Sequence, residues 1–500
     1  MNLSPNPGPV AFSDVQGIVR FGYAALTDAC FFLLKIRDRA AARSWMAAAP
    51  LTSAEKQPHA PDTALQLALT CEGLQALGLA QEIVAQFSAE FLSGMAGQSS
   101  RSRRLGDVGA SAPANWGWGG PGKMPHLLLM VYARPGALAA WCGQIQGPLW
   151  QAAFEVMECL PTSDLTGVEP FGFQDGVSQP ALDWECVREP EGQQQAYSNL
   201  VALGEFLLGY PNEYGQYTDR PLLAPAPANA GLPWSAEVPG QRDLGKNGTY
   251  VIFRQLQQDV RGFWRYLDGQ ANGDPALRQQ LAEATVGRRM NGDPMLPLRA
   301  QPIAGLDARQ VARNQFTYDA DPDGARCPFG AHVRRANPRN ADLPAGTSGW
   351  LDRLWRTLGF GTRGYRDDLL ASARFHRLLR RGREYGPGLS AAQAVDELPD
   401  TGEHGVQFLC IGASILRQFE FIQNAWMTNT KFNGLSGESD PVLGNRAPVA
   451  GCPASGNFSI PRAQQAPARL AEVPQFITVR GGAYFFLPGL GALRYLIRSE

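Results

Sequence analysis

The chain has 500 residues, of which 44% are hydrophobic and 18% charged, and its formal net charge is −1. Such a chain can bury a full core, which excludes a disordered or fibrous protein. The near-zero charge gives no general attraction to nucleic acid or to an anionic membrane, so we expect neither as a partner.

The first half of the chain alternates patterns typical of strands and of helices. The expected strands are 28–36, 63–70 and 124–133, and the expected helices are 37–49, 71–79 and 136–157. Residues 96–122 are rich in Gly, Ser and Pro, which predicts an irregular surface segment.

The second half repeats this alternation after another Gly- and Pro-rich region at 187–245. The expected strands are 248–253, 404–415 and 476–487, and the expected helices are 257–270, 275–289, 416–426 and 490–497. Residues 290–350 are loop-rich and basic. The two halves therefore look alike and predict two α+β units in tandem. The sequence does not show whether their sheets join.

The location of the protein is predicted from two absences in the sequence. Residues 1–10 lack the basic and apolar regions of a signal peptide, and no uncharged apolar run has the length of a membrane span. The eight cysteines form no C-x-x-C pair, which is typical of buried thiols in a reducing compartment. We therefore expect a cytoplasmic protein.

One stretch resembles a cofactor motif but lacks its context. Residues 117–122 match G-x-G-x-x-G, yet no strand precedes them and a strand rather than a helix follows. A dinucleotide site requires a strand before and a helix after the glycines, so we do not predict one.

His332 has unusual surroundings, in the stretch Cys327-Pro-Phe-Gly-Ala-His-Val-Arg-Arg-Ala-Asn-Pro-Arg339. No two of the five histidines are four residues apart, so a multi-histidine metal site would need distant segments. One imidazole is sufficient where a macrocycle such as haem supplies the other ligands. Arg334, Arg335 and Arg339 could then pair with the haem propionates. The alternative is a basic surface loop with an incidental histidine.

Two further stretches combine charge with an unusual backbone or apolar setting. In Pro170-Phe-Gly-Phe-Gln-Asp-Gly-Val-Ser-Gln-Pro180, Asp175 is either a turn residue or a carboxylate that glycines present to a flat ligand. In 375–388, arginines surround Leu378 and Leu379, which is not typical of a purely solvated charge run.

Together, these three stretches resemble the dye-decolourising (DyP-type) haem peroxidases, and the chain length is similar to that of their larger, C/D-like members. Residues 172–176 match the family's G-x-x-D-G. Residues 327–339 are similar to its proximal-histidine segment, and 378–382 to its distal-arginine segment. Residues 14–20 and 479–486 look like its first and last strands, so the resemblance covers nearly the whole chain.

The resemblance implies two tandem ferredoxin-like α+β domains of the dimeric α+β barrel type, with long loop insertions. Residues 1–240 would carry the G-x-x-D-G motif, and residues 241–500 would bind the haem.

The resemblance also implies one haem b per chain, with His332 as the proximal iron ligand. Asp175 would be the distal acid–base group and Arg380 the distal cation, with Arg381 as a competitor for that role. Asp440, in an Asp-Pro sequence, is our candidate to accept the second N–H of His332, although an ordinary turn is the alternative. The other residues expected to border the haem are Gly176, Val177, Ser178, Asn337, Pro338, Arg339 and Phe408.

The activity that the resemblance implies is reduction of hydrogen peroxide with oxidation of dyes, phenolics or other one-electron donors, through an oxo-ferryl intermediate. The alternative function is a haem-binding or haem-iron handling protein without significant peroxidase turnover. That protein would not need Asp175 and Arg380 together on one face. The sequence leaves the physiological reductant open, and also whether the protein is a monomer or a homodimer.

Overall fold

The computed structural model describes residues 8–186, 199–297, 308–340, 372–396, 402–448, 455–462 and 464–498. Its main sheet consists of β1 (Asp28–Ile36), β2 (Thr63–Leu69), β3 (Leu127–Ala133), β4 (Phe154–Pro161), β9 (Thr249–Gln258), β10 (Leu379–Arg380), β11 (Arg383–Tyr385), β12 (Gly405–Gly412) and β15 (Ile477–Leu487). These strands pair antiparallel in the order β10-β12-β9-β15-β2-β3-β1-β4, and β11 also pairs with β12.

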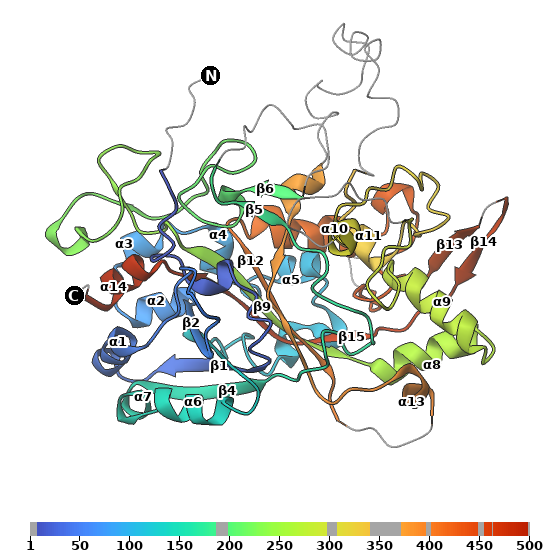
Figure 1. Ribbon diagram of the computed structural model, residues 1–500, viewed down its shortest axis with the longest axis horizontal. Coiled ribbons are helices and arrows are strands. Elements are labelled where there is room, and N and C mark those ends of the chain that lie inside the picture. Colours follow the sequence, from blue (N-terminus) through green and yellow to red (C-terminus); the bar gives the residue numbers. More distant parts are fainter. Residues whose placement is uncertain are drawn as a thin grey trace, which may run out of the picture.

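One sheet therefore runs through both halves of the chain (Figure 1). The strands of the first half join those of the second half where β2 meets β15, with Phe486 opposite Leu69. This pairing answers the question that the sequence left open, because the two sheets are continuous. The boundary expected near residue 240 stays a prediction.

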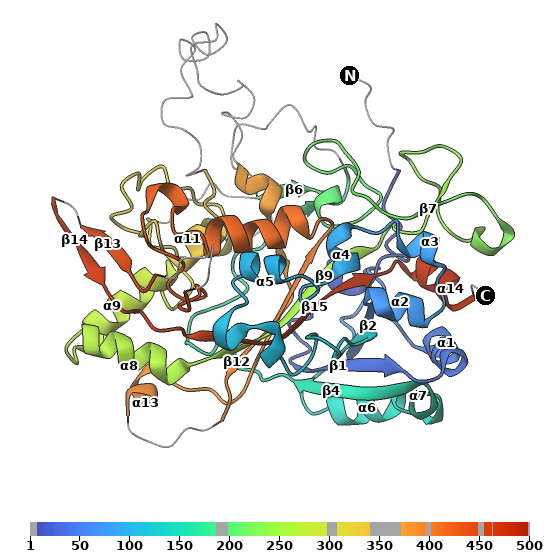
Figure 2. The same ribbon diagram turned by 180° about the vertical axis from the view of Figure 1, so that it is seen from behind.

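The remaining strands form short pairs outside this sheet. They are β5 (Ala181–Asp183) with β6 (Leu200–Ala202), β7 (Leu222–Leu223) with β8 (Arg242–Asp243), and β13 (Phe458–Arg462) with β14 (Gln465–Leu470). Figures 1 and 2 show the β13–β14 pair projecting beyond α9, far from the N-terminal strands.

The α-helices are mostly short. They are α1 (Arg39–Ala48), α2 (Cys71–Ala76), α3 (Gln81–Val84), α4 (Ala89–Ser93), α5 (Ser99–Leu105), α6 (Leu138–Ile145), α7 (Pro148–Ala153), α8 (Val260–Gln270), α9 (Pro275–Val286), α10 (Ala308–Asn314), α11 (His332–Ala336), α13 (Ala391–Val395) and α14 (Leu490–Arg498). Two π-helical stretches, Leu416–Glu420 and Ile422–Met427, follow β12, and the second packs against α5 and α11. None of the helices in the described ranges has the length and apolar character needed to cross a bilayer.

Both faces of the sheet are covered, which explains its nearly continuous apolar strands. On one face, Trp45 of α1, Leu74 of α2 and Trp150 of α7 pack against the strands. On the other face, loop segments replace helices, and Trp118 packs on Phe253 with 5.3 Å between ring centroids. The insertions therefore form part of the core.

The structure corrects three sequence predictions. The helix expected at 136–157 is broken at Gly147-Pro148, and its last residues form β4 at the sheet edge. Residues 96–122 are not a surface segment throughout, because Trp116 and Trp118 are fully buried. Residues 14–20 contain the 3₁₀ turn Gly17–Val19 instead of a strand.

We predict that Phe486→Ala destabilises both halves together. Phe486 is fully buried at the β2–β15 junction and contacts Phe87 at 4.9 Å between ring centroids. Truncating such a ring removes burial and leaves a cavity, which typically costs about 3–5 kcal/mol. Denaturant unfolding followed by fluorescence would measure this loss. The control Leu416→Ala, at a side chain that is 51% exposed, should change the unfolding free energy by only about 0.5 kcal/mol. Equal stability of the two variants would contradict the prediction.

Candidate active site

Asp175 lies on the loop between β4 and β5, which buried aromatic residues anchor. Phe171 and Phe173 are buried in an apolar cluster with α8, and the Phe171 ring lies 4.5 Å from that of Phe263. Gly176 has a φ of 72°, a left-handed conformation that favours glycine. The backbone is thus held in place, while the side chain of Asp175 stays 48% exposed.

Glu169 holds this loop from inside. Its carboxylate accepts the backbone N–H groups of Phe171 and Phe173, each at 3.0 Å, and Nε2 of Gln258 on β9 donates to it at 2.8 Å. Burial raises the pKa of Glu169 to about 7, although these hydrogen bonds oppose the rise. Glu169 was not predicted from the sequence, because an acid before a proline is an ordinary turn residue.

Arg380 on β10 binds Asp175 directly. Its Nη1 donates to Oδ1 of Asp175 at 2.8 Å. Gln179 connects the two segments a second time, since its Oε1 accepts the backbone N–H of Arg380 at 3.0 Å and its Nε2 donates to the Arg380 carbonyl at 3.1 Å. The structure therefore brings Asp175 and Arg380 together. Gln179 also escaped the sequence analysis, although it follows the G-x-x-D-G motif closely.

Arg381 points elsewhere. Its Nε donates to the carbonyl of Ile18 at 2.8 Å, and its Nη2 donates to that of Val19 at 3.3 Å. Its guanidinium is therefore bound to the N-terminal 3₁₀ turn. Arg381 does not compete with Arg380 for the place beside Asp175, which corrects the alternative left open by the sequence.

Phe408 lies on the same face of the sheet as Arg380. Cys410 of β12 is paired opposite Arg380, and Phe408 is two residues before Cys410, so the three side chains project from one face. The Phe408 side chain is half-buried. This position agrees with the sequence expectation of an aromatic residue near the distal pair, and its contact with haem stays a prediction.

His332 is the first residue of α11 and is held by Asp440. Its Nδ1 lies 3.1 Å from Oδ2 and 3.2 Å from Oδ1 of Asp440, which is fully buried. Oδ1 of Asp440 also accepts the backbone N–H of Val442 at 2.9 Å and that of Leu443 at 2.6 Å. The sequence left open whether Asp440 is the partner of His332 or an ordinary turn residue. Its carboxylate contacts both His332 and the backbone of the turn, so Asp440 is both.

A fixed acceptor at Nδ1 determines the chemistry available at the other ring nitrogen. The carboxylate favours the tautomer with its proton on Nδ1, so Nε2 carries a lone pair. Nε2 forms no hydrogen bond with any residue in the described part of the chain, and the side chain is 31% exposed. His332 therefore presents one available metal-binding nitrogen in a defined orientation.

Arg334 and Arg335 turn away from His332 into the protein. Arg335 donates to the carbonyls of Trp426 at 2.7 Å and Glu438 at 2.6 Å. Arg334 pairs with Asp321 at 3.0 Å. Both guanidinium groups are buried, so the expectation that they surround an anionic cofactor is wrong for these two residues. A buried guanidinium needs acceptors: all three nitrogens of Arg335 have them, whereas Arg334 donates through Nη1 and Nη2 and its Nε has no partner among the described residues.

Arg339 connects the His332 segment to the Asp175 loop. Its Nη1 donates to the carbonyls of Asn314 at 2.7 Å and Phe316 at 2.8 Å, and its Nη2 donates to Oγ of Ser178 at 3.3 Å. Asn337 accepts the backbone N–H of Arg339 at 3.3 Å. Arg339 and Ser178, both expected beside the cofactor, therefore lie next to each other.

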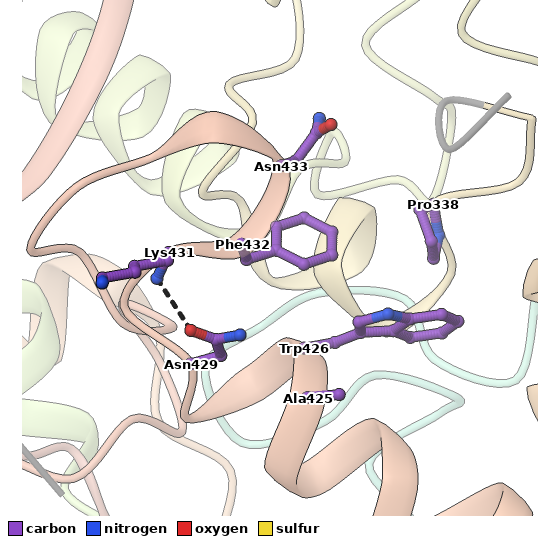
Figure 3. Close-up of a pocket in the computed structure, with 7 residues that line it drawn as sticks. All are labelled: Pro338, Ala425, Trp426, Asn429, Lys431, Phe432 and Asn433. Atoms are coloured by element: carbon purple, nitrogen blue, oxygen red, sulfur yellow. Dashed lines mark hydrogen bonds between the residues drawn. The ribbon is translucent and has the colours of Figure 1, made fainter. Parts of the chain in front are cut away.

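Three other residues that were expected to border the haem lie on two different segments. Gly176 is exposed and Val177 half-buried on the Asp175 loop, whereas Pro338 is buried. Pro338 lines a pocket of about 260 Å³ with Trp426 and Phe432 (Figure 3). The catalytic candidates do not line this pocket, so we assign it no chemical role. The expected haem contacts of these residues stay predictions.

Asp175, Arg380 and His332 influence one another electrostatically. Burial would raise the pKa of Asp175, but the charge of Arg380, the backbone N–H of Gly176 and the charge of His332 together lower it below its ordinary value. Burial lowers the pKa of His332, whereas Asp440 raises it and the net shift is upward. All three side chains are nevertheless partly exposed.

We predict that Asp440→Ala destabilises the segment around His332. The substitution leaves Nδ1 of His332 and the amides of Val442 and Leu443 without their acceptor. Each buried polar group left unsatisfied costs about 1–3 kcal/mol. Thermal or denaturant unfolding would measure the loss. Asp440→Asn is the matched control, because it keeps an oxygen acceptor, and it should lose clearly less stability than Asp440→Ala. Equal losses would show that these hydrogen bonds do not hold the segment.

Comparison with known proteins agrees with this arrangement. No family model matches the chain. The dye-decolorizing peroxidase msp1 of Mycetinis scorodonius is 26% identical over 509 residues, which cover 97% of this chain and 87% of that protein. The dye-decolorizing peroxidase AauDyP1 of Auricularia auricula-judae is 30% identical over 342 residues, covering 65% and 56% of the two chains.

The fold is similar to that of solved structures of dye-decolorizing peroxidases. A dye-decolorizing peroxidase in complex with 2,6-dimethoxyphenol superposes with a TM-score of 0.69 at 23% identity, covering 98% of this chain and all of the other. The α+β architecture expected from the sequence, of ferredoxin-like type, is thereby confirmed. The chain is therefore similar to dye-decolourising (DyP-type) peroxidases in sequence over nearly its full length, and it shares their fold.

Proposed function

We propose that this protein is a haem-dependent peroxidase that reduces hydrogen peroxide and oxidises dyes, phenolics or other one-electron donors. The observation that carries this proposal is the presence of two side-chain pairs whose members influence one another electrostatically. His332 with Asp440 offers a fixed metal-binding nitrogen, and Asp175 with Arg380 offers an acid–base group beside a permanent cation. The named relatives, which are peroxidases, support the same activity.

The residues present fit a haem, and we propose one haem b per chain. The donor set contains a single imidazole whose Nδ1 is engaged, which suits a metal whose other ligands come from a macrocycle. Arg339 is buried like Arg334 and Arg335, but it alone of the three donates to Ser178 on the Asp175 loop, where the pair could meet an anionic propionate. When bound, haem supplies an iron that can bind peroxide and exchange electrons.

Asp175 would move the proton of hydrogen peroxide. Cleavage of the O–O bond requires transfer of a proton from the inner to the outer oxygen. A carboxylate can accept that proton and return it, directly or through one water. Because the pKa of Asp175 is lowered, the group is ionised and ready to act as a base even in acidic solution.

Arg380 would stabilise the charge that develops as the O–O bond breaks. Its guanidinium remains charged at all accessible pH values and donates several hydrogen bonds from one plane. Gln179 fixes its backbone at both the N–H and the carbonyl, so the cation is preorganised rather than recruited during the reaction.

His332 would be the protein ligand of the haem iron, and Asp440 would fix the orientation of its imidazole. The carboxylate accepts the Nδ1–H and thereby keeps Nε2 available and oriented. Such a partner makes the imidazole a more basic ligand. This side of the site needs no movement, which agrees with the complete burial of Asp440.

A haem-binding or haem-iron handling protein without significant turnover is the alternative. It would need His332 and a propionate partner, but not the direct pair of Asp175 and Arg380. That pair favours catalysis. We further propose a cytoplasmic protein with hydrogen peroxide and a small-molecule or dye reductant as its partners, based on the sequence and the family.

The proposal is tested with His332→Ala. We expect the loaded wild-type protein to show a Soret band and peroxide-dependent dye oxidation, and the variant to lose or strongly shift the band because the iron ligand is gone. Absorption spectra with and without peroxide provide both measurements. Haem bound with an unchanged spectrum in the variant would overturn the ligand assignment, and a Soret band without turnover in the wild type would favour the haem carrier.

The second prediction concerns the pH profile. Burial would raise the pKa of Asp175, but Arg380, the Gly176 amide and His332 together lower it below its ordinary value. As pH falls, the base is lost only below its ordinary pKa of about 3.8, so the reaction with peroxide should remain fast in acid and dye oxidation should have an acidic optimum. In Arg380→Leu the acid limb should move to higher pH, because burial then dominates. An unmoved limb or a neutral optimum would contradict this.

The third prediction ranks the distal residues by the rate of reaction with peroxide. Arg380→Leu removes the cation and should lower the rate about 10³-fold. Asp175→Ala should cost less, about 10²-fold, because water can relay part of the proton transfer. Arg381→Leu is the matched control and should have little effect, since Arg381 is bound to the Ile18 carbonyl. Stopped-flow rates would measure the order. A smaller loss in Arg380→Leu than in Asp175→Ala would reverse our assignment.

A further inference from the structure

Two cysteines that the proposed reaction does not use lie against each other in the N-terminal part of the sheet. Cys30 is on β1 and Cys159 on β4, and 2.7 Å separates their Sγ atoms. The two strands are paired antiparallel, with Phe32 opposite Cys159 and Cys30 opposite Pro161. Because Cys30 and Phe32 share one face of β1, the two thiols project from the same face of the sheet.

The two thiols differ in access to solvent. Cys30 is buried, with 4% of its surface exposed, and belongs to the core under the N-terminal helices. Cys159 is exposed, because β4 is the edge strand of the main sheet. An exposed thiol backed by a buried one is the arrangement of a reactive cysteine with a resolving partner.

The contact also makes the two thiols chemically unequal. The hydrogen bond from Cys30 is the main influence that lowers the pKa of Cys159 to about 7, while burial and Glu158 oppose it. The pKa of Cys30 shifts in the opposite direction, because the same hydrogen bond and burial both raise it. Cys159 is therefore the thiol that ionises first, and the thiolate is the nucleophilic form.

We propose that Cys159 and Cys30 form a peroxide-responsive dithiol that closes to a disulfide between β1 and β4. The Cys159 thiolate attacks one oxygen of hydrogen peroxide, the O–O bond breaks, and sulfenic acid and hydroxide form. The Cys30 thiol then attacks the sulfenic sulfur, forms the S–S bond and releases water. Hydrogen peroxide is the oxidant and is reduced to two molecules of water once the hydroxide takes up the proton that Cys159 released to solvent when it ionised.

This inference uses the proposed function only for the source of the oxidant, because a peroxidase works where peroxide is present. The thiol chemistry itself involves neither haem nor the distal pair. A closed bond would link residues 129 positions apart and would attach the edge strand covalently to the sheet interior. Such a link restricts the unfolded chain and stabilises the native state.

The experiment treats the haem-loaded protein with a small excess of hydrogen peroxide and then counts thiols in denaturant. We expect the loss of two of the eight thiols per chain, recovered by a small-molecule thiol, and a peptide map in which the segments of Cys30 and Cys159 are linked. Cys159→Ser should prevent the loss. In Cys30→Ser the reaction should stop at the sulfenic acid, which dimedone would trap at Cys159.

Cys142→Ser is the matched control, because Cys142 on α6 packs against the same core and acts electrostatically on Cys30. Its substitution should leave the loss of two thiols unchanged. Retention of all eight thiols in the wild type, or linkage of Cys159 to Cys142 instead, would overturn the proposal.

The same assay on His332→Ala separates this inference from the proposed function. Disulfide formation in the variant shows direct reaction of peroxide with the thiol, whatever the outcome for peroxidase turnover. Failure in the variant together with success in the wild type would show that the oxidation depends on haem, and would overturn the direct route.

Discussion

The guanidinium of Arg335 is the constraint on which the proximal side of the site depends. It is completely buried and donates to the carbonyls of Gly330, Trp426, Asn429 and Glu438. Arg335 is three residues after His332, and its acceptor Glu438 is two residues before Asp440. One cation therefore ties α11, the π-helical stretch and the Asp440 turn together. Since no buried guanidinium can be left without acceptors, these segments are held in one arrangement, and the hydrogen bond between His332 and Asp440 follows from it.

The distal side is built differently, and the difference fits its chemistry. Asp175 and Arg380 are partly exposed, and their positions come from neighbours that fix the backbone: Glu169 under the loop and Gln179 beside β10. Small molecules and protons can reach these side chains, whereas Asp440 is sealed from solvent. A fixed imidazole and an accessible carboxylate–guanidinium pair are the features that the proposed reduction of peroxide would use.

Much of the sheet could be predicted from local pattern, and the failures have physical reasons. Buried strands such as β2, β3 and β15 are continuous apolar runs, so the sequence indicated them within a few residues. β4 was mistaken for the end of a helix because an edge strand is only half covered and its apolar spacing is ambiguous. Trp116 and Trp118 are buried through contacts with distant segments, which no local rule shows.

The sequence by itself identified the candidate residues: Asp175 in the G-x-x-D-G motif, His332 in its basic segment and Arg380 in its own. It could not separate Arg380 from Arg381, because adjacent residues differ only in the direction that β10 gives them. Only the tertiary structure decided that Asp175 meets Arg380 across 205 residues, that His332 meets Asp440 across 108, and that Cys30 meets Cys159. Residue types are local, whereas such contacts depend on strand register and on buried charges that must find partners.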